Sequence, residues 1–130
     1  MRIGADYYPE HWEKERWKTD AEMMVKANIK VIRIGEFAWS LYEPEEGKYE
    51  FDWMDEALDF FGKYGIKVVM CTPSATPPKW MIDKYPDILQ NDIHGNPKLF
   101  GTRKHYCFNS ETYREKTKKL NTLIAKRYAK

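Results

Sequence analysis

Several features that would point to particular classes of protein are missing from the sequence. Its 130 residues include only two cysteines, Cys71 and Cys107, for which a disulfide is possible but reduced packing residues are the expectation. It contains neither an apolar run of about 18 residues nor the apolar segment of a secretory signal, so no membrane partner is expected. The 22 basic and 20 acidic residues leave a net charge of +2, which gives no reason to expect nucleic acid. Together these absences predict a reducing, cytoplasmic location.

The sequence also lacks low-complexity segments, Gly/Ser linkers and charge blocks, so we expect residues 1–130 to form one piece without an internal boundary. What it has in quantity is aromatic residues, including five Trp and nine Tyr. Aromatic rings can stack on sugar rings, but they also fill protein cores, and core packing is the expectation for most of them.

A helix that leads into a strand occurs twice. The run ANIKVI at residues 27–32 is echoed by YGIKVV at 64–69, and each follows an amphipathic stretch. Asn28 and Gly65 are residue types that tolerate the left-handed conformation just past a helix end. We therefore expect helices to end at both positions.

The apolar spacing predicts three strands and three helices in alternation. Strands are expected at about residues 2–8, 31–37 and 67–72, and helices at about 13–27, 52–65 and from 111 onward. The second and third strands do not alternate apolar and polar residues, which is typical of strands covered on both faces. Alternating strands and helices predict an α/β fold with parallel pairing, as either a doubly wound sheet or an eight-fold barrel.

The long loops follow strands, at residues 38–52 and 73–110, whereas the connections into the second and third strands are short. Barrel enzymes build their active sites from such loops, and doubly wound folds do so too. No glycine-rich phosphate loop follows a strand, which removes the main support for a nucleotide-binding sheet.

Charged residues gather where the strands are expected to end. Arg33 lies in an apolar strand and needs a carboxylate partner, because an unpaired buried charge is costly. Asp6 and Glu36 are the candidates. An internal salt bridge and the orientation of a catalytic carboxylate or sugar hydroxyl both explain Arg33, and both can hold together.

The second polar cluster lies in the long loop before the last helix. Arg103 and His105 can reach a ligand there, or they can be ordinary solvated loop residues. Lys116, Lys118 and Lys119 are expected on a solvated helix face. Three acidic residues flank a polar turn and are also expected to be solvated: Glu43, Glu45 and Glu46.

Four motifs resemble those of the glycoside hydrolase family 42 β-galactosidases. They are GADYYPEHW at 4–12, RIGEFAWS at 33–40, TPSATPPKW at 72–80 and RKHYCFNS at 103–110. Four long motifs in order over nearly the whole chain make the resemblance specific. It implies a (β/α)8 TIM barrel, a hydrolase that cleaves terminal β-galactosides with retention, and two glutamates after strands four and seven, which retention places about 5 Å apart.

The same resemblance assigns roles to individual residues. Arg103 matches an arginine that contacts galactose, and Arg33 and Glu36 match polar residues that line the pocket. Cys107 matches the first cysteine of a structural zinc site found in some members. No further cofactor is implied.

One departure from the family pattern limits these expectations. The acid/base of the family lies in an Asn-Glu pair, and no Asn-Glu pair occurs in this sequence. Glu36 is the one well-placed acid, and one acid cannot carry out a double displacement. We therefore expect the first three βα units of a β-galactosidase barrel, inactive alone, with no second cysteine for the zinc site.

Two alternatives remain open at this point. One is a non-catalytic half-barrel that forms a homo-oligomer or binds a complementing chain, because a partial barrel leaves strand edges unpaired. The other is a different barrel hydrolase that shares only the architecture, against which the run from Arg103 to Ser110 argues.

Overall fold

The computed structural model describes residues 3–102 and 104–129, which form two compact units. The first comprises residues 3–36 and 50–71, and the second comprises the remaining described residues. In the described residues, no helix is both long and apolar enough to span a membrane.

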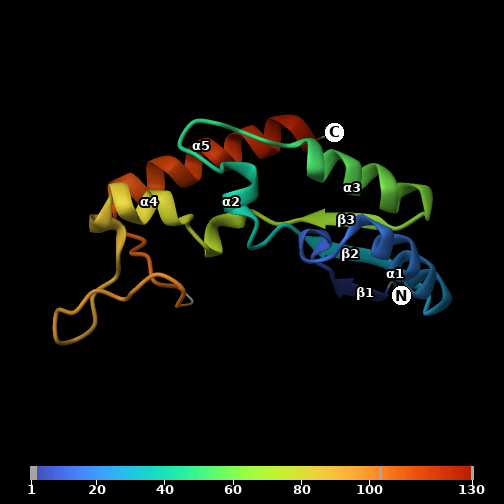
Figure 1. Ribbon diagram of the computed structural model, residues 1–130, viewed down its shortest axis with the longest axis horizontal. Helices are drawn as coiled ribbons and strands as arrows, with labels where there is room; N and C mark the ends of the chain where they lie inside the picture. The colour runs from blue at the N-terminus through green and yellow to red at the C-terminus, as the bar shows by residue number, and fades with distance from the viewer. Residues whose placement is uncertain (1–2, 103, 130) are drawn as a thin grey trace. The chain divides into compact units, whose positions relative to one another are not determined.

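The first unit is built on a parallel sheet of three strands in the order β1-β2-β3. These are β1 (Ile3–Asp6), β2 (Ile29–Ile34) and β3 (Lys67–Met70), and they lie side by side in chain order in Figure 1. Parallel neighbours need crossover connections. Here α1 (Lys14–Lys26) connects β1 to β2, and α3 (Asp52–Lys63) lies in the connection from β2 to β3. The predicted α/β alternation with parallel pairing is confirmed.

The two residues expected at the helix ends have the predicted backbone conformation. Asn28 has a φ of 58° and Gly65 a φ of 69°. The amide of Ile66 donates to the carbonyl of Phe61 and that of Gly65 to the carbonyl of Gly62, which satisfies groups left free at the end of α3. The chain thereby turns directly from α3 toward β3.

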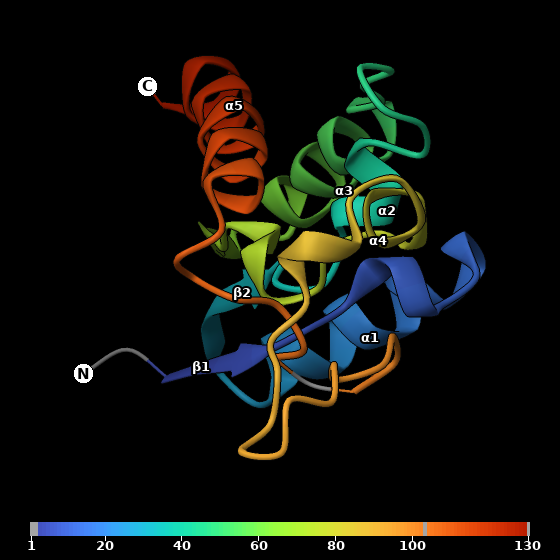
Figure 2. The same cartoon turned by 90° about the vertical axis from the view of Figure 1, so that its left-hand side faces the viewer.

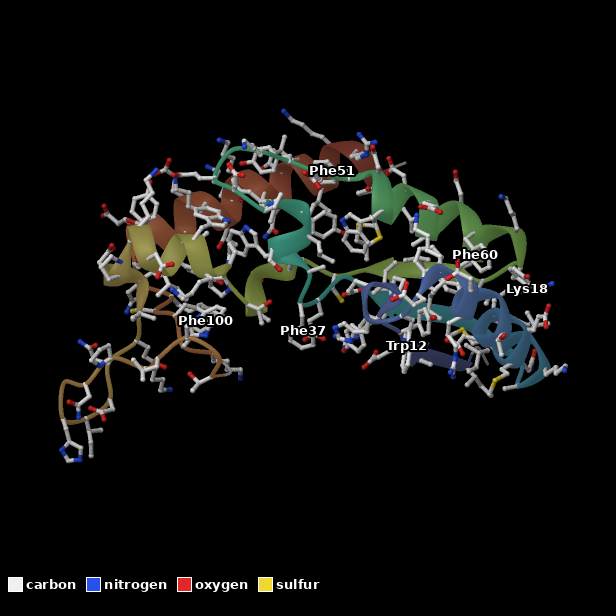
Figure 3. All side chains as sticks on the ribbon, viewed as in Figure 1. Trp12, Lys18, Phe37, Phe51, Phe60 and Phe100 are labelled. Atoms are coloured by element: carbon white, nitrogen blue, oxygen red, sulfur yellow. The ribbon has the colours of Figure 1, made fainter. Side chains whose placement is uncertain are left out.

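An aromatic cluster joins the helices and the first strand within this unit. The Tyr7 and Phe61 rings meet edge to face at 5.2 Å, and Trp17 lies 5.8 Å from Phe60 and 6.1 Å from Phe61. Figure 3 labels Phe60 on α3. The indole of Trp17 donates to the carbonyl of Pro9 at 3.0 Å, so its polar atom is satisfied. Tyr7, Trp17 and Phe61 are buried in the core of this unit, whereas Trp12 is exposed, so the expectation of core packing for most aromatic residues is only partly met.

The two faces of the sheet differ in burial. Ile32 and Ile34 of β2 are fully buried, whereas the alternate residues Val31 and Arg33 are only half-buried. The exposed side chain of Val69 is the register partner of Arg33. One face is therefore packed and the other is open, because successive strand residues point to opposite sides.

The second unit is built from short helices and one long one. It contains α2 (Trp39–Tyr42), α4 (Lys79–Lys84) and α5 (Glu111–Tyr128), with single 3-10 turns at Pro73–Ala75 and Pro86–Ile88; a further such turn, Pro9–His11, follows β1 in the first unit. The Ser110 hydroxyl accepts the Tyr113 amide at 3.2 Å and caps α5. Tyr106 stacks on Tyr113 at 4.4 Å, and the Tyr113 hydroxyl donates to the Ser74 carbonyl at 2.7 Å.

A long loop between the 3-10 turn at Pro86–Ile88 and α5 belongs to this second unit and is orange in Figure 2. Its two arms meet where the Gln90 amide donates to the His105 carbonyl and the Cys107 amide donates to the Ile88 carbonyl, each at 2.7 Å. Phe100, labelled in Figure 3, lies in this loop. The loop is therefore closed at its base by backbone hydrogen bonds.

The end of α3 provides a matched pair of substitutions. We expect Gly65→Ala to destabilise the chain by about 1–2 kcal/mol, because alanine pays to hold a positive φ. Gly62→Ala should stabilise it by up to about 1 kcal/mol, because Gly62 lies in the helix with no heavy atom within 4 Å of an added Cβ. Urea unfolding followed by circular dichroism measures both. Changes of the same sign would contradict the conformation assigned to Gly65.

Candidate functional site

Arg33 lies at the centre of a cluster of polar side chains at the carboxyl ends of the strands. Its register partner on β1 is Asp6. The Arg33 Nε donates to Asp6 Oδ1 at 2.7 Å, and Nη2 donates to Asp6 Oδ2 at 2.8 Å. This is the bidentate geometry in which a guanidinium binds a carboxylate most strongly. The expected need of Arg33 for a carboxylate is confirmed.

Glu36, which follows β2, and Cys71, which follows β3, contact the same guanidinium. Glu36 Oε2 lies 2.8 Å from Arg33 Nη2, and Cys71 Sγ lies 3.8 Å from Nη1. Glu36 follows Gly35, whose φ of 82° turns the chain out of β2. The backbone amide of Cys71 donates to the Ile34 carbonyl at 2.9 Å, so Cys71 continues the pairing of β3 with β2. All three strand ends thus converge on one cation.

The cluster borders a hollow of about 340 Å³ on the open face of the sheet. Its lining consists of residues from the first two strands: Gly4, Ala5, Asp6, Val31 and Arg33. A Cβ on Gly4 would lie 3.0 Å from the Val31 carbonyl oxygen, so a side chain there would make β1 and β2 move apart by a few tenths of an ångström. The hollow and the charged cluster therefore depend on the same strand pairing.

The charges in this cluster stabilise one another in their ionised forms. The hydrogen bonds from Arg33 hold the pKa of Asp6 below its usual value. Asp6 in turn raises the pKa of Arg33 through the same hydrogen bonds. Two carboxylates share one guanidinium, so the cluster carries one excess negative charge near neutral pH. Such a site suits neutral hydrogen-bond donors, such as hydroxyl groups, better than anions.

The predicted ligand residues of the long loop have different outcomes. Arg103 lies outside the described residues. His105 is 2% exposed, so the expectation of an ordinary solvated residue is wrong for it. Its Nδ1 lies 2.6 Å from the carbonyl oxygen of Thr102, which can only accept, so Nδ1 carries the proton. His105 also lines a cavity of about 430 Å³ whose walls include Phe100 and Pro77.

The predicted metal ligand, Cys107, is a half-buried free thiol. In the described part of the chain, no group of three His, Cys, Asp or Glu side chains could hold a metal ion. A structural zinc site takes four ligands. The described residues therefore do not fit a zinc ion by themselves.

Three further acidic residues have environments that the sequence did not reveal. Glu43 is buried, where it accepts from the Trp39 indole at 3.0 Å and from the Gly47 amide at 2.9 Å. Glu46 binds Lys84, Lys116 and the Tyr85 hydroxyl. The expectation of solvation is wrong for both glutamates and for Lys116, because folding brings the turn against α4 and α5. Glu10 has buried carboxylate oxygens, and burial raises its pKa.

Sequence reasoning thus found Asp6, Arg33 and Glu36 but missed Cys71 as a neighbour of the guanidinium. The only available signal was its position, one residue past the end of β3, because an apolar strand cysteine otherwise suggests packing.

Comparison with known proteins identifies relatives along nearly the entire chain. A family profile described as beta-galactosidase, of the glycoside hydrolase 42 group, matches residues 6–130. A beta-galactosidase of Thermus thermophilus is 54% identical over 126 residues, which cover 97% of this chain and 20% of the relative. Beta-galactosidase BgaH of Haloferax lucentense is 49% identical over 129 residues and is likewise covered to 20%. The chain spans about a fifth of the length of these relatives.

Solved structures give the same result. The beta-galactosidase of Halorubrum lacusprofundi superposes with a TM-score of 0.94 at 46% identity, over 99% of this chain and 19% of that one. The alpha-amylase AmyB of Thermotoga neapolitana superposes with a TM-score of 0.56 at 11% identity, which shows a shared fold alone. The parallel three-stranded sheet with its helices is therefore part of an α/β barrel.

The Glu46 cluster leads to a prediction about pH. Hydrogen bonds from Lys116, Lys84 and Tyr85, in that order, lower the pKa of Glu46 to about 2 from 4.5. Because the folded pKa is the lower one, the stabilisation is full above pH 4.5 and is lost as the pH falls toward 2. Carbon-13 NMR titration of the Glu46 carboxyl should give a midpoint near 2.

Substitution of the lysines tests the cause of this shift. Lys116→Gln should raise the Glu46 pKa more than Lys84→Gln does, and Lys118→Gln, on an exposed part of α5, should leave it unchanged. A Glu46 midpoint that stays near 4.5 in the unsubstituted chain would contradict the cluster.

Proposed function

Because the chain belongs to the β-galactosidase family of glycoside hydrolases, we propose that it forms the N-terminal part of the catalytic barrel of a retaining enzyme. That enzyme hydrolyses terminal non-reducing β-D-galactosyl residues. The observation that supports this function best is the convergence of Asp6, Arg33 and Glu36 at the strand ends, where barrel enzymes bind their substrates. The activity belongs to a protein about five times as long, because the chain spans 20% of its relatives.

Asp6 and Glu36 are suited to binding rather than to bond cleavage. A general acid needs a pKa raised toward neutrality, and Arg33 lowers the pKa of Asp6 instead. A retaining enzyme also needs a nucleophile about 5 Å from that acid, with both acting at the same sugar carbon. Asp6 and Glu36 are instead tied to one guanidinium. The two catalytic glutamates therefore come from the remainder of the barrel.

Substrate binding is the role that this part of the barrel performs. Glu36 and Arg33 supply a carboxylate and a guanidinium at the end of β2, and Arg103 supplies a second guanidinium by resemblance. Carboxylates and guanidinium groups are the partners that sugar hydroxyls need, since the first accepts and the second donates. We assign these three residues to the galactoside.

Cys107 is assigned to a structural zinc site only together with ligands from the rest of the longer protein. A thiolate is a ligand that zinc prefers, and Cys107 is a free thiol. Both cysteines are free, which agrees with a reducing compartment such as the cytoplasm.

Activity measurements test the proposal directly. The 130-residue chain alone should not hydrolyse a chromogenic β-galactoside, because it lacks both catalytic glutamates. The chain joined to the remaining four-fifths of the Thermus thermophilus relative should hydrolyse it. In this joined enzyme, Glu36→Gln should lower kcat/KM by roughly 10- to 100-fold, the effect of removing a charged acceptor from a hydrogen bond to the substrate.

Glu45→Gln provides the matched control, because Glu45 is an exposed acid that pairs only with Lys48 on a surface turn. It should leave kcat/KM unchanged. A joined enzyme that folds but has no activity toward galactosides would overturn the proposed function.

A second candidate function rests on the sheet of the first unit. In the described residues, the outer edges of β1 and β3 pair with no further strand, and one face of the sheet is open. Unpaired parallel edges are templates for association. We therefore propose that the separate chain self-associates or binds a chain that carries the rest of the barrel.

Light scattering tests this association. The chain alone, of 15.6 kDa, should give a mass above that of the monomer, and addition of the separately made remainder of the relative should give a one-to-one complex. A stable monomer that does not bind the added chain would exclude both self-association and binding of a complementing chain.

A further inference from the structure

The Arg33 guanidinium has a fixed number of N–H donors, and the structure shows the partners of most of them. An arginine has five N–H donors, one on Nε and two on each terminal nitrogen. Nε binds Asp6, Nη2 lies at hydrogen-bond distance from both Asp6 and Glu36, and Nη1 faces the sulfur of Cys71. Three of the five donors therefore make hydrogen bonds inside the protein, and the Glu36 carboxylate lies beside Nη2 as an ion-pair partner. Arg33 is engaged chiefly in holding other side chains.

Asp6 has the stronger hold on this guanidinium. It accepts two hydrogen bonds through both of its oxygens, whereas Glu36 forms an ion pair with Nη2 through Oε2. Asp6 also lies on β1, directly across the ladder from Arg33. Glu36 lies in a turn after β2, outside any helix or strand. A side chain on a paired strand is held more rigidly than one on a turn.

Glu36 has a carboxylate oxygen that can accept a hydrogen bond from a ligand. Its Oε2 is bound to Arg33, and among the described residues no hydrogen bond reaches its Oε1. The side chain is 21% exposed, which leaves it accessible. A sugar hydroxyl can donate to this oxygen without displacing the ion pair.

We propose that Asp6 is a positioning residue of the galactoside site. It fixes the guanidinium of Arg33, and Arg33 fixes Glu36 with Oε1 available to a sugar hydroxyl. Arg33 thereby acts on the galactoside through Glu36 as well as through its own remaining donors. This inference rests on the proposed function. It adds Asp6 to the galactoside site and states that the position of Glu36 depends on Arg33, and that of Arg33 on Asp6.

Kinetics of the joined enzyme described above test the dependence. Asp6→Asn keeps the size of the side chain and removes one acceptor and the charge. It should raise KM about tenfold. It should change kcat by the same factor as Glu36→Gln does, because both variants impair the contact of the Glu36 carboxylate with the sugar hydroxyl. Asp6→Glu keeps a carboxylate and should recover most of the loss. A purely structural role would lower the amount of active enzyme and leave KM unchanged.

The double variant gives the sharper test. If Asp6 acts through Glu36, adding Asp6→Asn to Glu36→Gln should cause no further loss in kcat/KM beyond about twofold. Losses that multiply would show that the two residues act independently, and would overturn the proposal. Glu56→Gln is the matched control, because Glu56 forms an ion pair with Lys14 and has a side-chain exposure of 50% against 53% for Asp6. It should leave both KM and kcat unchanged.

Crystal structures of the joined enzyme separate this proposal from the proposed function. In Asp6→Asn the guanidinium of Arg33 and the carboxylate of Glu36 should both shift, whereas in Glu36→Gln the bidentate pair of Arg33 with Asp6 should remain. A Glu36 carboxylate that keeps its place in Asp6→Asn would overturn the positioning role. This comparison is decisive even if the joined enzyme has no galactosidase activity, an outcome that bears on the proposed function alone.

Discussion

Parallel pairing of three strands is the constraint on which the rest of the first unit depends. Parallel neighbours cannot be joined by a tight turn, so the chain must cross over between them, and here α1 and α3 lie in these crossovers. The helices cover one face of the sheet and bury Ile32 and Ile34. The same constraint brings the carboxyl ends of all three strands to one edge. Charged residues placed there in the sequence necessarily meet.

Arg33 is tolerated in an apolar strand because these strand ends provide its partners. Asp6 comes from the first strand, Glu36 from the turn after the second, and Cys71 from the end of the third. The register of the sheet sets the contact with Asp6, which lies directly across from Arg33. The cluster is ionised and carries excess negative charge, which suits neutral hydroxyl groups better than anions.

The second unit shows how acidic residues that look alike in the sequence acquire different environments. Glu43, Glu45 and Glu46 lie within four positions of one another. Glu43 is buried and accepts two hydrogen bonds, whereas Glu45 is exposed. Glu46 forms ion pairs with two lysines and accepts a hydrogen bond from a tyrosine. His105 shows the same effect, since a loop residue becomes 2% exposed. The side-chain partners of Glu43, Glu45 and His105 lie within four positions of them, whereas those of Glu46 come from segments far away in the chain.

The sequence by itself determined the alternation of strands and helices, because that depends on local apolar spacing and on residues such as Asn28 and Gly65. It also determined that Arg33 needs a carboxylate, because the cost of an unpaired charge is independent of the fold. Which carboxylate holds it was decided by the tertiary structure alone, since Asp6 becomes its neighbour only through the pairing of β1 with β2. The same holds for Glu46, whose partners Lys84, Tyr85 and Lys116 come from distant segments that no local pattern encodes.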